Sequence, residues 1–148
     1  MFSKACEYGI KAMIYVALKS KQQTRVGLND IATQIDSPVS FTAKILQKLV
    51  KDDLINSLKG PTGGFFISEE DAKNIKLSRI VTSLDGDSVY KGCGMGFNEC
   101  NDLRPCVLHH RFKIVREELR YMLEETSLDE LTNDIYYGIS YLKSKSNN

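Results

Sequence analysis

The segment from residue 28 to residue 67 places two short amphipathic stretches, separated by a proline-containing turn, directly before a glycine-rich hairpin. The first stretch carries apolar residues at helical spacing: Leu28, Ile31, Ala32 and Ile35. Asp36-Ser37-Pro38 predicts its end, because proline disfavours a helical residue before it. Two short helices joined by a tight turn are typical of a helix-turn-helix.

The second stretch would begin at Ser40, a good N-cap residue. Its apolar side consists of Phe41, Ile45, Leu46 and Leu49. The remaining face is small, polar and cationic, as a recognition helix in a major groove requires, and its expected DNA contacts are Ser40, Thr42, Ala43, Lys44 and Lys48. An ordinary three-helix bundle with a solvated face would show the same pattern.

Residues 54–58 and 65–67 alternate like two paired strands, and residues 59–64, Lys-Gly-Pro-Thr-Gly-Gly, form the turn between them. A hairpin that directly follows a recognition helix is a wing, and we call residues 54–67 the wing. We expect Lys59 and Thr62 at its tip to contact DNA. The glycines could instead cradle a nucleotide phosphate, but no Gly-Lys-Ser/Thr sequence accompanies them.

The net charge of +1 conceals an asymmetry between the two halves of the chain. Residues 1–66 carry nine Lys/Arg and five Asp/Glu, whereas residues 67–148 carry eleven and fourteen. The basic half predicts nucleic-acid contact, although an uneven solvated surface would look the same. No stretch is apolar enough to span a bilayer, so we expect no membrane partner, a cytoplasmic location and reduced thiols.

Four further helices are expected. One is centred on residues 10–18, a short one covers residues 78–84, and a long one follows Leu108. In the long helix the apolar residues Leu108, Phe112, Val115, Leu119 and Met122 alternate at spacings of four and three, as in the seam of a helix that packs against a partner. Packing against its own domain would satisfy the same pattern. Ser127 to Glu130 predicts a capping box that opens a last helix.

These elements predict a mainly α-helical protein with a small β-hairpin, namely a winged helix-turn-helix domain plus a long dimerisation helix. The expected divisions are residues 1–85 for the DNA-binding domain, 86–106 for a cysteine-bearing sensor loop and 107–148 for the dimerisation and C-terminal helices. We call residues 86–106 the cysteine segment. Its glycine-rich part, residues 87–105, is expected to be a loop.

Three of the four cysteines, Cys93, Cys100 and Cys106, lie within fourteen residues in that segment. Thiolates in such a loop can bind a soft metal or an iron–sulfur cluster, and the gaps of six and five residues are too wide for a usual structural zinc site. The remaining ligand could be His109, one helical turn after Cys106, or Glu7 or Cys6 on the first helix. A metal-free redox disulfide is the alternative.

The chain resembles the Rrf-two family of bacterial regulators, which includes the IscR, NsrR and CymR branches. The resemblance rests on four marks: Ser3 to Met13 (Ser-Lys-x-x-Glu-Tyr-Gly-Ile-Lys-Ala-Met), Leu28-x-Asp-Ile-Ala with the helix from Phe41 to Leu54, the turn from Lys59 to Phe65, and the three spaced cysteines followed by His109. The chain departs from the family in its six-residue first cysteine gap, in Lys59 where arginine is frequent, and in Ala43 where some IscR-like members have glutamate.

The resemblance implies a homodimer, joined through the helix after Cys106, that binds double-stranded DNA at a pseudo-palindromic operator. It also implies a 2Fe–2S or 4Fe–4S cluster on Cys93, Cys100 and Cys106, with His109 as the fourth ligand in the IscR-like branch or Glu7 in the NsrR-like branch. Aerobic purification could remove such a cluster. The expected function is therefore regulation of transcription, not enzymatic catalysis, in response to iron–sulfur status, redox state or nitric oxide.

Two rival functions remain at this point. The CymR branch implies a metal-free regulator that responds to thiol chemistry or a small molecule on the same fold. An iron–sulfur electron carrier is the other rival, but it would leave the wing without a role.

Overall fold

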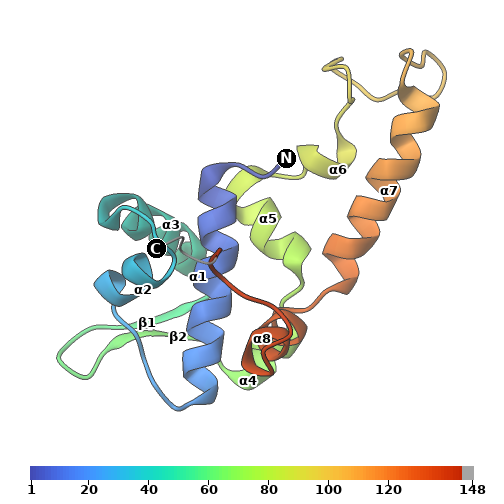
Figure 1. Ribbon diagram of the computed structural model, residues 1–148. Helices are drawn as coiled ribbons and strands as arrows, with labels where there is room; N and C mark the ends of the chain where they lie inside the picture. The colour runs from blue at the N-terminus through green and yellow to red at the C-terminus, as the bar shows by residue number, and fades with distance from the viewer. Residues whose placement is uncertain (145–148) are drawn as a thin grey trace.

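The computed structural model describes residues 1–144, and Figure 1 shows how its elements are arranged. In chain order these are α1 (Lys4–Lys21), α2 (Leu28–Gln34), α3 (Val39–Lys51), β1 (Asn56–Leu58), β2 (Gly64–Phe66), α4 (Glu69–Asn74), α5 (Leu77–Asp85), α6 (Ser88–Lys91), α7 (His109–Glu125) and α8 (Leu128–Tyr136). The predicted fold class, mainly helical with one hairpin, is confirmed. Among the helices of residues 1–144, none has the length and apolarity needed to cross a lipid bilayer.

Helix α1 lies at the centre of the molecule and contacts α3, α5 and α8 (Figure 1). Its hydroxyl N-cap is Ser3, whose Oγ accepts from the Cys6 backbone N–H at 3.1 Å. The side chains of Met13 and Val16 are fully buried on the faces that α1 presents to its neighbours. A helix surrounded in this way must be apolar on more than one side, which agrees with the broad apolar band of residues 10–18.

The helix-turn-helix forms as predicted, but Ser40 is not the N-cap of α3. The helix begins at Val39, and Pro38 occupies the N-cap position with an extended ψ of 136°. Proline suits that position because its missing N–H removes no hydrogen bond from the first turn, and its carbonyl accepts from the Thr42 backbone N–H at 2.9 Å. Ser40 is therefore free to point outward from the first turn.

The wing is shorter than predicted and is anchored by a third segment. Strands β1 and β2 pair antiparallel, with Ser57 opposite Phe65, while Leu54 and Ile55 are buried ahead of β1. Val26, in the α1–α2 linker, exchanges two backbone hydrogen bonds with Phe65, at 3.2 Å and 2.8 Å. Gly64 permits this close approach: its φ is 137°, and a Cβ there would lie 2.9 Å from the Val26 carbonyl oxygen.

The expected loop at residues 87–105 contains one short helix, α6, which the sequence interpretation missed. Tyr90 is buried in this turn, and its hydroxyl lies 3.0 Å from Thr82 Oγ1 on α5. Asp87 and Lys91 form an ion pair across the same turn at 2.6 Å. The docking of Tyr90 on α5 explains why a helical turn forms in an otherwise glycine-rich stretch.

Helix α7 lies to one side of the molecule, with α6 and the cysteine segment near its N-terminal end (Figure 1). The predicted apolar seam divides in two. Phe112 and Leu119 are half-buried, and Leu119 packs against the core, whereas Leu108, Val115 and Met122 are exposed. Packing against the chain's own domain therefore applies to Leu119, and packing of the exposed residues against a partner stays a prediction. The predicted capping box at the start of α8 is present, with Ser127 and Glu130 bonded reciprocally.

Candidate DNA-binding surface and cysteine site

The outer face of α3 carries one exposed polar stripe, formed by Ser40, Lys44, Gln47 and Lys51. We call these four residues the α3 stripe. It contains no acidic residue, and Ala43 lies half-buried next to it. The small residues at the N-terminal end can approach base edges, whereas the two lysines can reach phosphates.

The structure corrects the expectation for Thr42, whereas a DNA contact of Lys48 stays a prediction. Thr42 is fully buried, and its hydroxyl bonds inward to Ser37 Oγ at 2.9 Å and to the Pro38 carbonyl at 2.8 Å, so it is not available to DNA. Lys48 is partly exposed but is paired with Asp52 at 3.0 Å. Asp52 also accepts from Ser83 on α5, so Lys48 lies on the side of α3 that faces α5.

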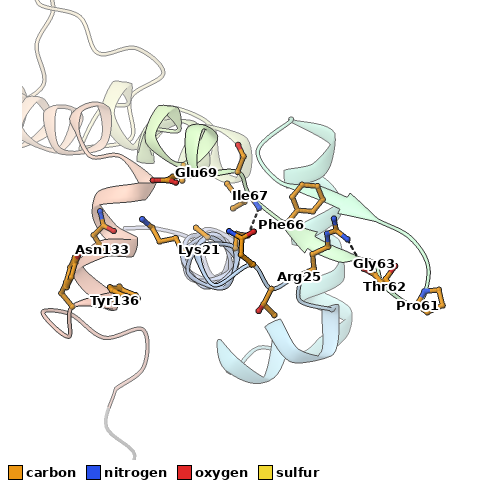
Figure 2. Close-up of a pocket in the computed structure, with 17 residues that line it drawn as sticks. Lys21, Arg25, Pro61, Thr62, Gly63, Phe66, Ile67, Glu69, Asn133 and Tyr136 are labelled. Carbon is orange, nitrogen blue, oxygen red and sulfur yellow. Dashed lines mark hydrogen bonds between the residues drawn. The ribbon is translucent and has the colours of Figure 1, made fainter.

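Lys59 and Thr62 are exposed at the tip of the wing, as predicted from the turn sequence. Sequence reasoning missed Arg25, in the α1–α2 linker. Figure 2 shows its guanidinium beside the wing, stacked 5.2 Å from the Phe66 ring and donating to the Thr62 carbonyl at 3.2 Å. Arg25 also lines a groove of about 1050 Å³ between the end of α1, the wing and α8. Arg25 adds an exposed positive charge beside the wing, although it lies far from the wing in the sequence.

The cysteine segment brings its donors together as two pairs. Cys93 Sγ lies 3.6 Å from Cys106 Sγ, and Cys100 Sγ lies 3.3 Å from His109 Nδ1. Backbone N–H groups, chiefly that of Met95 at 3.4 Å, hold the pKa of the Cys93 thiol below its ordinary value. Among residues 1–144, no three His, Cys, Asp or Glu side chains already converge at metal-binding distances.

His109 is oriented by a carboxylate that sequence reasoning did not identify. The imidazole is 4% exposed, and its Nε2 lies 2.7 Å from Asp102 Oδ1. Lys113 also donates to Asp102, at 3.2 Å, and these two hydrogen bonds hold the pKa of the Asp102 carboxyl below its usual range. With Asp102 on Nε2, the other ring nitrogen, Nδ1, is the one presented to Cys100, as is common for histidines that bind metals.

Arg116 is the second residue of this site that sequence reasoning missed. Its Nη1 donates to Cys100 Sγ at 2.9 Å and to the Gly92 carbonyl at 3.0 Å. It follows His109 by two helical turns, so both side chains lie on the inner face of α7. The seven-residue spacing from His109 was the only signal in the sequence. It was a weak signal, because a charged residue on a helix is usually solvated.

The two candidates on α1 are not brought to the cysteine segment within one chain. Glu7 forms an ion pair with Lys4 at 3.1 Å on the surface of α1. Cys6 is fully buried, and burial, with the carboxylate of Asp85 nearby, raises the pKa of its thiol to about 12. Cys6 is therefore a core residue, whereas Glu7 pairs with Lys4 on the surface of α1.

Three thiols and one imidazole form a soft donor set of the kind that binds iron–sulfur clusters. A thiolate-bound cluster is anionic, and the buried Arg116 guanidinium points at one of these thiols. The residues present therefore fit such a group.

Comparison with known proteins agrees with this combination of wing and cysteines. The Rrf2 family, described as iron-dependent transcriptional regulators, matches residues 2–134. The chain belongs to the Rrf2 family. It is a DNA-binding transcriptional regulator, and its relatives are regulators of transcription, not enzymes.

The similar proteins of this Rrf2-family regulator include members of two branches, IscR and CymR. The transcriptional regulator IscR of Serratia proteamaculans (strain 568) is 30% identical over 127 residues, covering 86% of this chain and 76% of IscR. The structure of CymR, the global cysteine regulator of B. subtilis, aligns with a TM-score of 0.73 at 20% identity, covering 90% of this chain and 96% of CymR. The structure of T. potens IscR gives the same TM-score at 18% identity, covering 95% and 92% of the two chains. At these identities the structural likenesses establish the shared winged-helix fold.

Proposed function

We propose that this Rrf2-family regulator binds a pseudo-palindromic operator as a homodimer and holds an iron–sulfur cluster in its cysteine segment. The observation that carries the cluster is the donor set of Cys93, Cys100, Cys106 and His109, with Asp102 fixing the imidazole. The description of the family as iron-dependent supports the same conclusion.

The grouping of the donors favours a two-iron cluster over a four-iron one. Each iron of a 2Fe–2S cluster takes two protein ligands, and histidine can replace cysteine on one of the irons. Cys93 with Cys106 and Cys100 with His109 are two such pairs. A 4Fe–4S cluster with Glu7 from a second copy of the chain is the alternative assignment.

Bound there, the cluster would supply a centre that responds to oxidants, nitric oxide or a shortage of iron. The protein's own residues link that centre to α7, because His109 begins the helix and Arg116 bonds to Gly92 at the other end of the loop. Loss of the cluster would release these ties and alter the start of α7. A coupling of about 1–3 kcal/mol between cluster and DNA binding would give a useful response.

The homodimer is supported by an unpartnered apolar surface on α7 and just before it. The exposed fractions of six apolar residues lie between 40% and 81%: Val107, Leu108, Ile114, Val115, Tyr121 and Met122. We call these six residues the α7 stripe. They repeat at heptad spacing along one side of the helix, and a continuous apolar patch of this kind usually marks an interface.

Two charged residues that lie between the members of the α7 stripe favour an antiparallel pair of helices. Arg111 and Glu118 are exposed on the same side, three positions before and three after the centre at Ile114 and Val115. A two-fold axis at that centre would place Arg111 of each copy opposite Glu118 of the other. A parallel pair would instead place like charges together.

DNA binding in the dimer would use the α3 stripe in the major groove, with Lys59, Thr62 and Arg25 on the backbone or in the minor groove. Two recognition helices of a symmetric dimer fit half-sites about 34 Å apart, one turn of DNA. The pseudo-palindromic operator follows from that symmetry.

The test begins with anaerobic purification, followed by an absorption spectrum and by iron and sulfide analysis. We expect about two irons and two sulfides per chain, and a DNA affinity in a mobility-shift assay that changes when the cluster is removed. Cys100→Ala should lose the iron, whereas the control Cys6→Ala should retain it. An iron-free protein, or one whose DNA affinity is the same with and without cluster, contradicts the proposal.

The contact between Cys93 and Cys106 favours a second candidate, a metal-free thiol switch. Their sulfurs are 3.6 Å apart, so little movement would bring them to disulfide distance. A two-electron oxidant such as hydrogen peroxide would accept the two electrons and two protons that the thiols lose. A colourless, iron-free protein that forms this disulfide and changes its DNA affinity would establish the second candidate in place of the first.

A further inference from the structure

Helix α7 buries a cation that has no carboxylate partner in the described part of the chain, residues 1–144. Its buried residues are His109, Arg116 and Leu123, which lie two helical turns apart on one face. Arg116 is only 8% exposed. A buried guanidinium is costly unless an anion compensates it. Within residues 1–144, Arg116 forms no ion pair with an acidic side chain, and its hydrogen bonds go to Gly92 and Cys100.

The sulfur of Cys100 is the group that can supply the missing negative charge. A neutral thiol is a weak acceptor, whereas a thiolate bound to iron is anionic and accepts hydrogen bonds. The 2.9 Å contact between Arg116 Nη1 and Cys100 Sγ therefore has the geometry of a charge-assisted hydrogen bond to a cluster ligand. The second bond, to the Gly92 carbonyl, fixes the guanidinium in this position.

We propose that Arg116 is a positioning residue for the cluster: it donates to Cys100 and compensates the negative charge of the thiolate-bound iron, which raises the reduction potential of the cluster. This inference rests on the proposed function. In the redox step, one electron passes from an external reductant to the cluster and no bond breaks. Because that electron adds negative charge, a nearby fixed cation stabilises the reduced form more than the oxidised form.

The same contact explains why the cation is an arginine on α7. A guanidinium presents several donors in a fixed plane, so one side chain can bond to a sulfur and to a carbonyl at the same time. Lysine would keep the positive charge on one ammonium group, but it would lose the planar set of donors that bonds to the sulfur and the carbonyl together. The charge and the hydrogen-bond geometry can therefore be separated by substitution.

The experiment is a redox titration of the reconstituted full-length protein, followed by absorption and electron paramagnetic resonance. Arg116→Gln removes the charge and retains a polar group, whereas Arg116→Met removes the charge without introducing a polar group into the buried site. Arg116→Lys retains the charge. Arg104→Gln is the matched control, because Arg104 lies in the cysteine segment, is exposed and undergoes the same change of charge.

We expect both neutral variants to have a more negative midpoint potential than the wild type. The ratio of reduced to oxidised cluster at a fixed potential should fall about tenfold, equivalent to about 59 mV for one electron. Arg116→Lys should lie closer to the wild type, and Arg104→Gln should match it. If the neutral variants take up no cluster while Arg116→Lys does, the charge is required and the inference is again supported.

Two results would overturn the inference about Arg116 but leave the proposed function unaffected. One is a cluster in the neutral variants with the wild-type potential. The other is loss of the cluster from every Arg116 variant, lysine included, which would mean that Arg116 only holds the loop through Gly92. A wild-type protein that takes up no iron would overturn the proposed function, and this inference with it.

Discussion

Cys6 shows at the scale of one residue how burial separates a structural thiol from reactive ones. It lies on α1 with no exposed surface, whereas Cys93, Cys100 and Cys106 are partly exposed. Because reaction with an alkylating agent requires both access and the thiolate, a buried thiol with a raised pKa reacts slowly.

We therefore expect three thiols of the native, metal-free protein to react with iodoacetamide at pH 8 and the fourth to react only after denaturation. At this pH the raised pKa of Cys6, about 12, keeps that thiol protonated. Mass spectrometry of the digested protein identifies the unmodified cysteine. Rapid modification of Cys6 in the native protein would show that the N-terminal end of α1 opens readily.

Thr42 leads to a second prediction at this scale. Thr42→Val removes a buried hydroxyl that bonds to Ser37 and Pro38 and leaves the Pro38 carbonyl with one partner fewer. The free energy of unfolding should fall by about 1–3 kcal/mol in urea denaturation, while Thr42→Ser should recover part of it.

The matched control for Thr42→Val is Ser40→Ala on the exposed side of α3. It should leave stability within about 0.5 kcal/mol and should weaken binding to operator DNA, a loss that Thr42→Val should not share. If Thr42→Val weakened DNA binding and Ser40→Ala did not, Thr42 would belong to the DNA-binding surface.

Some individual residues could not be predicted from the sequence, and the physical reason is common to them. Arg25 acquires its role from the wing, which is distant in sequence, whereas Asp102 and Arg116 acquire theirs from the folded path of the cysteine segment. The spacing of the cysteines does not specify that path. The helical spacing expected between Cys106 and His109 does not form, because α7 begins only at His109, and the imidazole contacts Cys100 instead.

At the scale of elements, periodicity located the helices well and their ends less well. The apolar repeat gave α2 and α3, but Pro38 rather than Ser40 caps α3, since proline geometry at the turn outweighs hydroxyl capping. Helix α6 was missed because its stability comes from the docking of Tyr90 on α5, a tertiary contact. The division of the chain at residues 85 and 106 stays a prediction.

The wing carries the prediction that belongs to this scale. Lys59→Ala should weaken binding to all DNA sequences about equally and reduce the slope of log K against log salt by about one. Arg25→Ala should have the same effect if its guanidinium reaches a phosphate from its place beside Phe66. Fluorescence anisotropy at several salt concentrations measures the slope.

Lys73→Ala is the control for the wing variants, because Lys73 lies on α4 and is paired with Glu69. Its slope should equal that of the wild type. An unchanged slope in Lys59→Ala would exclude a phosphate contact from the tip of the wing.

For the whole molecule, the predicted dimerisation through α7 depends on a surface that the isolated chain leaves exposed. The single seam expected from sequence proved to be two, since Leu119 packs against the chain's own core and Phe112 is half-buried, whereas the α7 stripe faces outward. Sequence periodicity cannot distinguish the two sides, because both have apolar residues at the same spacing.

The antiparallel arrangement predicts a charge-swap experiment. Arg111→Glu and Glu118→Arg should each place like charges opposite one another in the dimer, and each should weaken dimerisation at least about tenfold, or about 1.4 kcal/mol. The double variant restores opposite charges and should dimerise as the wild type does. Analytical ultracentrifugation measures the dissociation constants.

Two outcomes would contradict the antiparallel register. Single variants that remain dimers would place the two charges outside the interface. A double variant that stays monomeric would mean that the two positions do not face each other.

Helix α1 has one more consequence for how such a molecule can move. At its start, Ser3 bonds to Asp85 at the end of α5, next to α6 and the cysteine segment, and beyond its end Val26 bonds to Phe65 in the wing. Its 18 residues make a rod about 27 Å long through the core. A rod held at both ends does not bend to absorb a small push, so a shift at the cysteine end would reach the wing as a tilt of the same rigid body.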